Sequence, residues 1–372
     1  MAMSKKVVIK VGTSTLLDEG KKLNEKKIEE LSEQIATIWK NGYRVILVTS
    51  GAIVTGMKIL SWDERPRRIV DSQVCAAVGQ GELIHMYFEK FRRHNIYIGQ
   101  ILLTRDDFSH RERYLNLRNT LTRMLELNIL PIINENDTVS VEEIRIGDND
   151  TLSAIVASKI CADYLILLTD VDGLYPDEPQ KCIKENIKPI PEVHRITDEI
   201  EKLAGYSAYG SFGVGGMKTK IEAAKIVTRS GGTVIIANGK IENVLLRILL
   251  NKEQIGTKFL PVKEFTQRER WIAFGRRMKG KIYVDDGAKE ALILKNKSLL
   301  PTGIVRVEGK FRAGDMVSIN DLEGNEIARG LVYYSSEEIE KIKGKKSSEI
   351  PSILGEDKGY EEVIHRDNMV IL

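Results

Sequence analysis

The 372-residue sequence has no apolar run that approaches the roughly 20 residues a membrane-spanning helix needs. Its N-terminus begins with charged residues but lacks an apolar segment followed by a small-residue cleavage site, so we expect a cytoplasmic protein. The three cysteines, Cys75, Cys161 and Cys182, form no CxxC pair, which argues against a disulfide framework or a zinc knuckle. The five histidines lack metal-ligand spacing, so the sequence predicts no metal centre built from protein side chains.

The sequence also lacks a strong excess of charge of either sign, its formal net charge being +3. Residues 276–372 contain 17 basic and 17 acidic residues, and the part before them contains 39 and 36. Because nucleic-acid binders commonly have a strong basic excess, this balance argues against RNA as a partner. The apolar share of 42% and the charged share of 29% are ordinary for a globular protein, and the length suffices for two domains.

An alternation of strand and helix begins near the N-terminus. The apolar residues 7–11 predict a strand, residues 24–41 have helical periodicity, and residues 43–49 predict a second strand. This order implies parallel strands joined by a right-handed crossover. The polar turns that follow the two strands, at 12–14 and 50–52, would then lie at the carboxyl edge of one sheet, where open α/β folds bind ligands.

Two lysines lie where an anion would suit them. Lys10 falls inside the first apolar strand, where its ammonium either extends along the sheet edge to water or meets an anion beside the following turn. Residues 210–220 form a glycine-rich loop that enters a helix and ends at Lys220. Free N–H groups and the positive end of the helix dipole favour an anion there. The loop matches neither the Walker A nor the GxGxxG pattern.

The stretch 132–153, INENDTVSVEEIRIGDNDTLSA, concentrates short acids and amides between an apolar strand and an alanine-rich helix. The acids and amides form two clusters, at 134–137 and at 148–150. One cluster alone is typical of a solvated turn with an Asx cap. Two clusters around a single connection favour a site that holds a small zwitterion or organises cationic groups.

Two further segments leave alternatives open. The strand 164–168 runs into TDVDG, where Asp170 or Asp172 either contacts a ribose hydroxyl or a metal-phosphate group, or belongs to a simple DG turn. The largely helical segment 70–93 is interrupted by Gly79-Gln80-Gly81, which marks a close helix-to-helix approach or a hinge, and we favour packing.

The pattern of the sequence changes beyond a connector at 256–280. Short strand candidates with Gly and Asp-Gly punctuation replace the alternation of strands and helices, at 281–284, 303–307, 315–319 and 326–333. We therefore predict a first domain at 1–257, a linker at 258–277 and a small β-rich domain at 278–372.

Taken together, six segments resemble the amino acid kinase family, and in it the members that phosphorylate free glutamate in the first step of proline synthesis. The segments are KVGTS (10–14), VTSGAI (48–53), PIINEND (131–137), GDNDTLSA (147–154), LLTDVDGLY (167–175) and GGMKTK (215–220). The C-terminal part, with SLLPTGI at 298–304, resembles a PUA domain.

This resemblance implies an α/β protein, with an αβα sandwich around a mainly parallel eight-stranded sheet and a small β-rich C-terminal PUA domain. It implies ATP-dependent phosphorylation of the γ-carboxylate of L-glutamate, with ATP as co-substrate and Mg²⁺ as cofactor. It also implies feedback inhibition by proline and a homo-oligomer, either a dimer or a tetramer. The alternatives are phosphorylation of N-acetylglutamate or aspartate by another member of the family, and an RNA-binding PUA protein.

The resemblance also implies roles for individual residues. Lys10, Asp150 and Lys220 would be catalytic, with Asp150 orienting the two lysines. Ser50, Asp137 and Asn149 would hold glutamate. The nucleotide would be bound by Lys10, Thr169, Asp170, Val214, Gly215, Gly216, Met217, Lys218, Thr219 and Lys220. Val214 stands where relatives often have threonine, so we expect altered nucleotide affinity without loss of activity.

Overall fold

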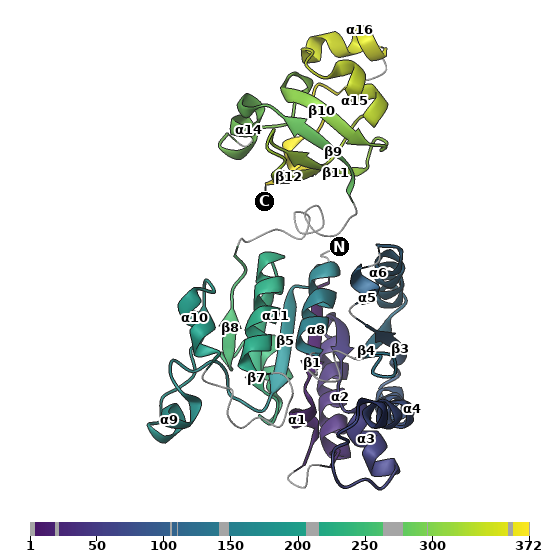
Figure 1. Ribbon diagram of the computed structural model, residues 1–372, viewed down its shortest axis with the longest axis vertical. Coiled ribbons are helices and arrows are strands. Elements are labelled where there is room, and N and C mark those ends of the chain that lie inside the picture. Colours follow the sequence, from purple (N-terminus) through teal and green to yellow (C-terminus); the bar gives the residue numbers. More distant parts are fainter. Residues whose placement is uncertain are drawn as a thin grey trace. The chain divides into compact units, whose positions relative to one another are not determined.

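The computed structural model describes residues 4–18, 22–104, 106–109, 111–140, 149–205, 216–262, 278–295, 297–355 and 360–371. The chain divides into two compact units, Met1–Glu264 and Phe265–Leu372 (Figure 1). This division falls inside the segment 258–277 predicted as a linker, although its first residues belong to a strand of the first unit. None of the helices in the described part of the chain is long and apolar enough to cross a membrane.

The first unit is built on an eight-stranded sheet with the order β3-β4-β2-β1-β5-β7-β8-β6 (Figure 1). All neighbouring strands are parallel except β7 and β8. The predicted mainly parallel sheet is therefore confirmed. The strands are β1 (Lys6–Val11), β2 (Arg44–Val48), β3 (Tyr97–Leu103), β4 (Ile129–Glu135), β5 (Tyr164–Thr169), β6 (Glu192–Val193), β7 (Thr233–Asn238) and β8 (Thr257–Phe259).

Helices pack on both faces of this sheet. On one face α2 contacts α4 and α12, and on the other α8 contacts α11, as right-handed crossovers in opposite directions along the sheet require. The central strands β1, β2 and β5 are almost wholly buried and apolar, as expected of parallel strands covered on both sides. The helices are α1 (Thr13–Leu16), α2 (Glu25–Lys40), α3 (Ala52–Ile59), α4 (Ile69–Arg92), α5 (Asp106–Ser109), α6 (Arg111–Glu126), α8 (Asn149–Lys159), α9 (Pro179–Lys184), α10 (Asp198–Leu203), α11 (Met217–Arg229) and α12 (Val244–Leu249).

The strand register brings the polar turns to one edge of the sheet. Lys10, the penultimate residue of β1, lies opposite Val48 of β2 and Leu167 of β5. β4 continues the same edge beside β2, where Val48 lies opposite Ile133. The segments that follow these strands therefore emerge side by side, as the sequence predicts.

The helix α4 is continuous through Gly79-Gln80-Gly81, so the predicted interruption is wrong. The predicted close packing is confirmed for Gly79 and not for Gly81, where an added Cβ would meet nothing within 4 Å. A Cβ added to Gly79 would lie 2.0 Å from the carbonyl oxygen of Ala52, at the start of α3. A Cβ added to Gly56 would lie 1.8 Å from the carbonyl oxygen of Cys75. The two glycines allow α3 and α4 to touch backbone to backbone, which fixes α4 against the segment that follows β2.

The second unit contains a five-stranded sheet with the order β10-β9-β11-β12-β13 and its own buried core. The predicted β-rich C-terminal fold is confirmed, and β13 and α16 are additional to the prediction. The elements are β9 (Met278–Val284), α14 (Asp286–Ile293), β10 (Ile304–Gly309), β11 (Met316–Asn320), β12 (Glu326–Leu331), α15 (Ser336–Ile342), α16 (Ile350–Leu354) and β13 (Met369–Ile371), with short 3₁₀ turns at Pro301–Gly303, Ser347–Glu349 and Arg366–Asn368.

Candidate active site

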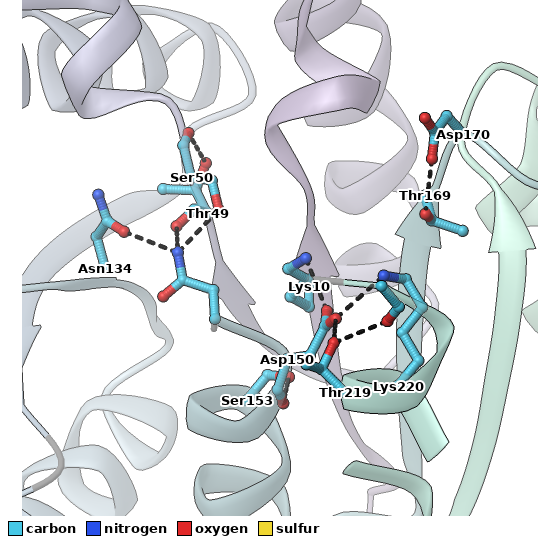
Figure 2. A network of polar contacts seen from close by, with 12 residues as sticks. Lys10, Thr49, Ser50, Asn134, Asp150, Ser153, Thr169, Asp170, Thr219 and Lys220 are labelled. Carbon is cyan, nitrogen blue, oxygen red and sulfur yellow. Dashed lines mark hydrogen bonds and ion pairs between the residues drawn. The ribbon is translucent and has the colours of Figure 1, made fainter. Parts of the chain in front are cut away.

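Two lysines from distant parts of the chain meet on one buried carboxylate (Figure 2). The Nζ of Lys10 lies 2.7 Å from Oδ1 of Asp150, and the Nζ of Lys220 lies 3.1 Å from Oδ2. The exposed fraction is 7% for Lys10, 5% for Lys220 and 1% for Asp150. The arrangement brings together β1, the start of α8 and the start of α11 at the carboxyl edge of the sheet.

The carboxylate of Asp150 is ionised because of its two partners. Burial on its own would raise the pKa of Asp150, but the ammonium groups of Lys10 and Lys220 act against this effect and hold the pKa well below its ordinary value of 3.8. The hydroxyl of Thr219 also donates to Oδ2 of Asp150, at 2.9 Å. At neutral pH the group is therefore an anion held between two cations.

Helix geometry explains why these residues lie where they do. Asp150 is in the first turn of α8, where a negative charge interacts favourably with the helix dipole. The hydroxyl of Ser153 donates to the main-chain oxygen of Asp150 at 2.7 Å and supports that turn. Lys220 is in the first turn of α11, where the dipole disfavours a cation, so Asp150 supplies the compensating charge.

A second cluster, the amide cluster, surrounds Asn149, the residue before Asp150 (Figure 2). Its Nδ2 lies 3.0 Å from the main-chain oxygen of Thr49, 2.8 Å from Oγ of Ser50 and 3.2 Å from Oδ1 of Asn134. Its Oδ1 is buried and accepts no hydrogen bond from the residues that the structure describes. The cluster thus joins the carboxyl ends of β2 and β4 to the start of α8. Among the described residues, Oδ1 of Asn149 is left as an acceptor that no donor reaches.

The turn after β2 positions Ser50. Gly51 has a φ of 110°, a left-handed conformation that disfavours residues with a Cβ, and it begins α3 immediately after Ser50. The hydroxyl of Thr49 is within 2.9 Å of the hydroxyl of Tyr87, and burial raises the pKa of Tyr87 to about 12. Tyr87 is therefore a neutral hydrogen-bonding partner of Thr49.

Asn134, which belongs to this cluster, and Gln80, which contacts Asn134, were not among the predicted site residues. Asn134 lies at the end of β4, and its Nδ2 donates to Oε1 of Gln80 on α4, at 2.8 Å. Asn134 belongs to the acid and amide run at 134–137, so the sequence carried a signal for it. Gln80 carried none beyond its place between two glycines.

Other predicted site residues lie outside these two clusters. Asp137 is half-buried in the turn that follows β4, on the same edge as the amide cluster. Thr169, at the end of β5, is buried and donates from Oγ1 to Oδ1 of Asp170 at 3.1 Å (Figure 2). In the first turn of α11 the side chain of Met217 is buried and that of Lys218 is exposed.

Part of the predicted nucleotide loop lies outside the described residues. Gly216 precedes α11 as its N-cap residue, whereas Val214 and Gly215 lie outside the described residues. At the start of α11, a helix of 13 residues, the N–H groups of the first turn have no partners within the helix. Such a helix start can receive an anion beside Lys220.

Comparison with known proteins gives a consistent result. Residues 5–238 match the amino acid kinase family and residues 280–354 match the PUA domain. The chain is 53% identical over 368 residues to a glutamate 5-kinase of Caldanaerobacter subterraneus subsp. tengcongensis, a match that covers 99% of this chain and 98% of the relative. It is 47% identical over 369 residues to a glutamate 5-kinase of Dictyoglomus thermophilum, which covers 99% and 98%. Among solved structures, a carbamate kinase of Giardia is 19% identical with a TM-score of 0.48, covering 70% of this chain and all of that one.

Proposed function

The chain belongs to the amino acid kinase family, and from that premise we propose that it transfers the γ-phosphoryl group of ATP to the γ-carboxylate of L-glutamate. The product is L-glutamyl 5-phosphate, the acyl phosphate that opens proline biosynthesis. The observation that carries the proposal is the convergence of Lys10 and Lys220 on Asp150, one residue after the amide cluster around Asn149.

The acceptor needs no general base. A γ-carboxylate with a pKa of about 4.3 is already ionised at neutral pH and is ready to attack phosphorus. The protein must instead align the attacking oxygen with the γ-phosphorus and offset the negative charge of the transferring group. Buried cations at fixed positions provide this without reorganisation during the reaction.

Lys10 and Lys220 serve as those cations. Each ammonium has three protons, so each can keep its ion pair with Asp150 and still donate to a phosphate oxygen. The start of α11 adds main-chain donors for the phosphates. Thr169 and Asp170, at the end of β5, are the proposed contacts to the rest of the nucleotide.

Mg²⁺ is the proposed companion of ATP. Both oxygens of Asp150 are engaged, by Lys10, Lys220 and Thr219, so this carboxylate fits the role of a lysine anchor better than that of a metal ligand. Mg²⁺ held by the phosphate oxygens would neutralise charge on the nucleotide.

Ser50, Asn149 and Asp137 form the proposed glutamate site. The carboxylate of Asp137 would pair with the α-ammonium, which N-acetylglutamate lacks, and so would give selectivity for the free amino acid. Proline, a cyclic relative of glutamate with a carboxylate and an ammonium, is the proposed feedback inhibitor at or over this pocket. A homo-oligomer formed through the first unit also stays a proposal.

Formation of acyl phosphate tests this function directly. The full chain is incubated with ATP, Mg²⁺ and either glutamate, N-acetylglutamate or aspartate, and the product is trapped as hydroxamate. We expect kcat/KM for glutamate to exceed that for N-acetylglutamate by about 100-fold, because that acceptor lacks the α-ammonium. We expect it to exceed that for aspartate by about 10- to 200-fold, because aspartate is one methylene shorter. Turnover of glutamate no better than of the others would refute the assignment.

A further inference from the structure

The amide of Asn134 is held in one orientation by two neighbours of opposite character. The main-chain nitrogen of Glu135 lies 2.9 Å from Oδ1 of Asn134. Because a main-chain N–H can only donate, the atom that faces it must be oxygen. The amide nitrogen of Asn134 then faces Oε1 of Gln80 at 2.8 Å, so Gln80 supplies its acceptor.

The amide of Asn149 is oriented in the same way. Its Nδ2 faces the main-chain oxygen of Thr49, which can only accept, and also faces the oxygen of Asn134. Its Oδ1 therefore points away from these acceptors. This oxygen has no hydrogen-bond partner among the described residues, although only 7% of Asn149 is exposed. A buried acceptor without a donor is unfavourable, so a ligand that brings a donor stabilises this state.

The chemistry of glutamate decides which group that donor is. At neutral pH both carboxylates of glutamate only accept hydrogen bonds, and the α-ammonium is its only donor. Ser50 completes the complementarity, because its oxygen accepts from Nδ2 of Asn149 and its proton is left to point at a carboxylate. The pocket therefore offers an acceptor for one end of the amino acid group and a donor for the other.

We propose that Gln80 is a positioning residue for glutamate recognition: by accepting from Nδ2 of Asn134 it anchors that amide in the orientation set by the main-chain nitrogen of Glu135. The oxygen of Asn134 then accepts from Asn149, and Oδ1 of Asn149 is left for the α-ammonium. The inference rests on the proposed function and assigns a role within the same site to a residue outside the predicted set. Gln80 itself does not touch the substrate.

The fold keeps Gln80 in place. Its neighbour Gly79 lies against the carbonyl oxygen of Ala52, so α4 packs directly on the backbone of α3 at this point. The helix α3 begins at Ala52, and its N-cap residue Gly51 directly follows Ser50. Gln80 on α4 and Ser50 just before α3 are thus positioned by the same pair of packed helices, which sets the spacing between them.

Two substitutions separate the acceptor from the shape of the side chain. Gln80→Met keeps the length of the side chain and removes the oxygen that accepts from Asn134, whereas Gln80→Glu keeps an acceptor at that position. The matched control is Gln34→Met, because Gln34 on α2 is buried and its Oε1 accepts from the main-chain nitrogen of Leu245 at 3.0 Å, in a different part of the unit. This control removes a buried hydrogen bond without affecting the amide row.

The measurement is steady-state kinetics of the full chain with glutamate and with glutarate, the same dicarboxylate without the ammonium. Loss of one hydrogen bond predicts that Gln80→Met raises KM for glutamate about fivefold and lowers the preference for glutamate over glutarate by a similar factor. The KM for ATP should change by less than roughly twofold, because the lysines lie outside the row. Gln80→Glu should restore most of the preference for glutamate over glutarate. Gln34→Met should lower the thermal stability but leave that preference unchanged.

The outcomes are distinguishable. A wild-type chain that does not phosphorylate glutamate refutes the proposed function itself. A wild-type chain that does, combined with a Gln80→Met variant of unchanged KM and unchanged preference, overturns the role of Gln80 alone. A Gln80→Glu variant as impaired as Gln80→Met would also overturn it, because the effect would then follow from shape and not from the acceptor.

Discussion

Replacing Asp150 with asparagine removes the charge that holds the two lysines together and keeps the shape of the side chain. At an effective dielectric constant of about 20, a unit charge pair contributes about 6 kcal/mol at 2.7 Å and about 5 kcal/mol at 3.1 Å. Desolvation of the three groups and repulsion between the ammoniums offset much of this. Removal of one partner from a buried ion pair therefore costs about 3–5 kcal/mol in practice.

We expect Asp150→Asn to lower the free energy of unfolding of the full chain by about 3 kcal/mol or more, which corresponds to a fall in Tm of roughly 6–12 °C. We also expect kcat to fall about 100-fold, because displacement of an aligned group by about 1 Å has effects of that size. Calorimetry and steady-state kinetics measure the two effects. The control is Thr219→Val, which removes the hydroxyl contact to the same carboxylate but keeps both ion pairs, and should cost about 1 kcal/mol.

The pH dependence follows from the lowered pKa of Asp150. A carboxyl group whose pKa is lowered by folding contributes stability that is complete above its unfolded value, here 3.8, and is lost as the pH falls through the folded value. The difference in stability between the wild-type chain and Asp150→Asn should therefore stay constant from about pH 5 to about pH 8. A difference that disappears within that interval, or an asparagine variant with near wild-type kcat, would refute the steering role of this carboxylate.

Other substitutions test other parts of the first unit. Lys10→Ala and Lys220→Ala should each lower kcat far more than they raise KM for glutamate in initial-rate assays, because both ammoniums act on charge that develops during transfer. Asp137→Ala should do the reverse, and an unchanged KM for glutamate would show that Asp137 does not bind the amino acid. Gly79→Ala places a Cβ 2.0 Å from a carbonyl oxygen of α3 and should destabilise the unit by about 1–3 kcal/mol in thermal unfolding. Gly81→Ala, whose Cβ meets nothing within 4 Å, should show no such loss.

Most of the fold could be predicted from local sequence patterns. The apolar strands β1, β2 and β5 and the periodic helix α2 were recognisable because parallel strands buried on both faces read as apolar runs and amphipathic helices as a repeat. The two-residue strand β6 and the three-residue strand β8 were not recognisable, because a strand of two or three residues is too short to show a periodic pattern. The predicted break in α4 failed because the close contact with α3, a tertiary effect, requires the glycines that local propensity treats as helix breakers.

The charged residues of the candidate site could be predicted from the sequence, whereas the uncharged side chain that reaches the site only through other amides could not. Lys10, Asp150 and Lys220 each stand out in the sequence because charged residues in apolar or helix-start positions need a partner. Gln80 does not, because a glutamine on a helix is an ordinary residue and its acceptor role arises only when α4 lies beside β4. Resemblance and patterning therefore identify candidate charged residues, whereas the contact between Gln80 and Asn134 becomes visible only in the fold.

The order of residues at the start of α8 explains how the two halves of the site are kept in register. Asn149 and Asp150 are consecutive, and consecutive residues of a helix point about 100° apart around its axis. One therefore faces Ser50 and the amide cluster, while the other faces Lys10 and Lys220 (Figure 2). In the proposed site, an amino acid whose ammonium is bound by the first and a phosphoryl group bound by the lysines paired with the second would both be positioned by this single turn. Because in-line transfer depends on the distance between these two groups, the adjacency of Asn149 and Asp150 would fix one part of that distance within the chain itself.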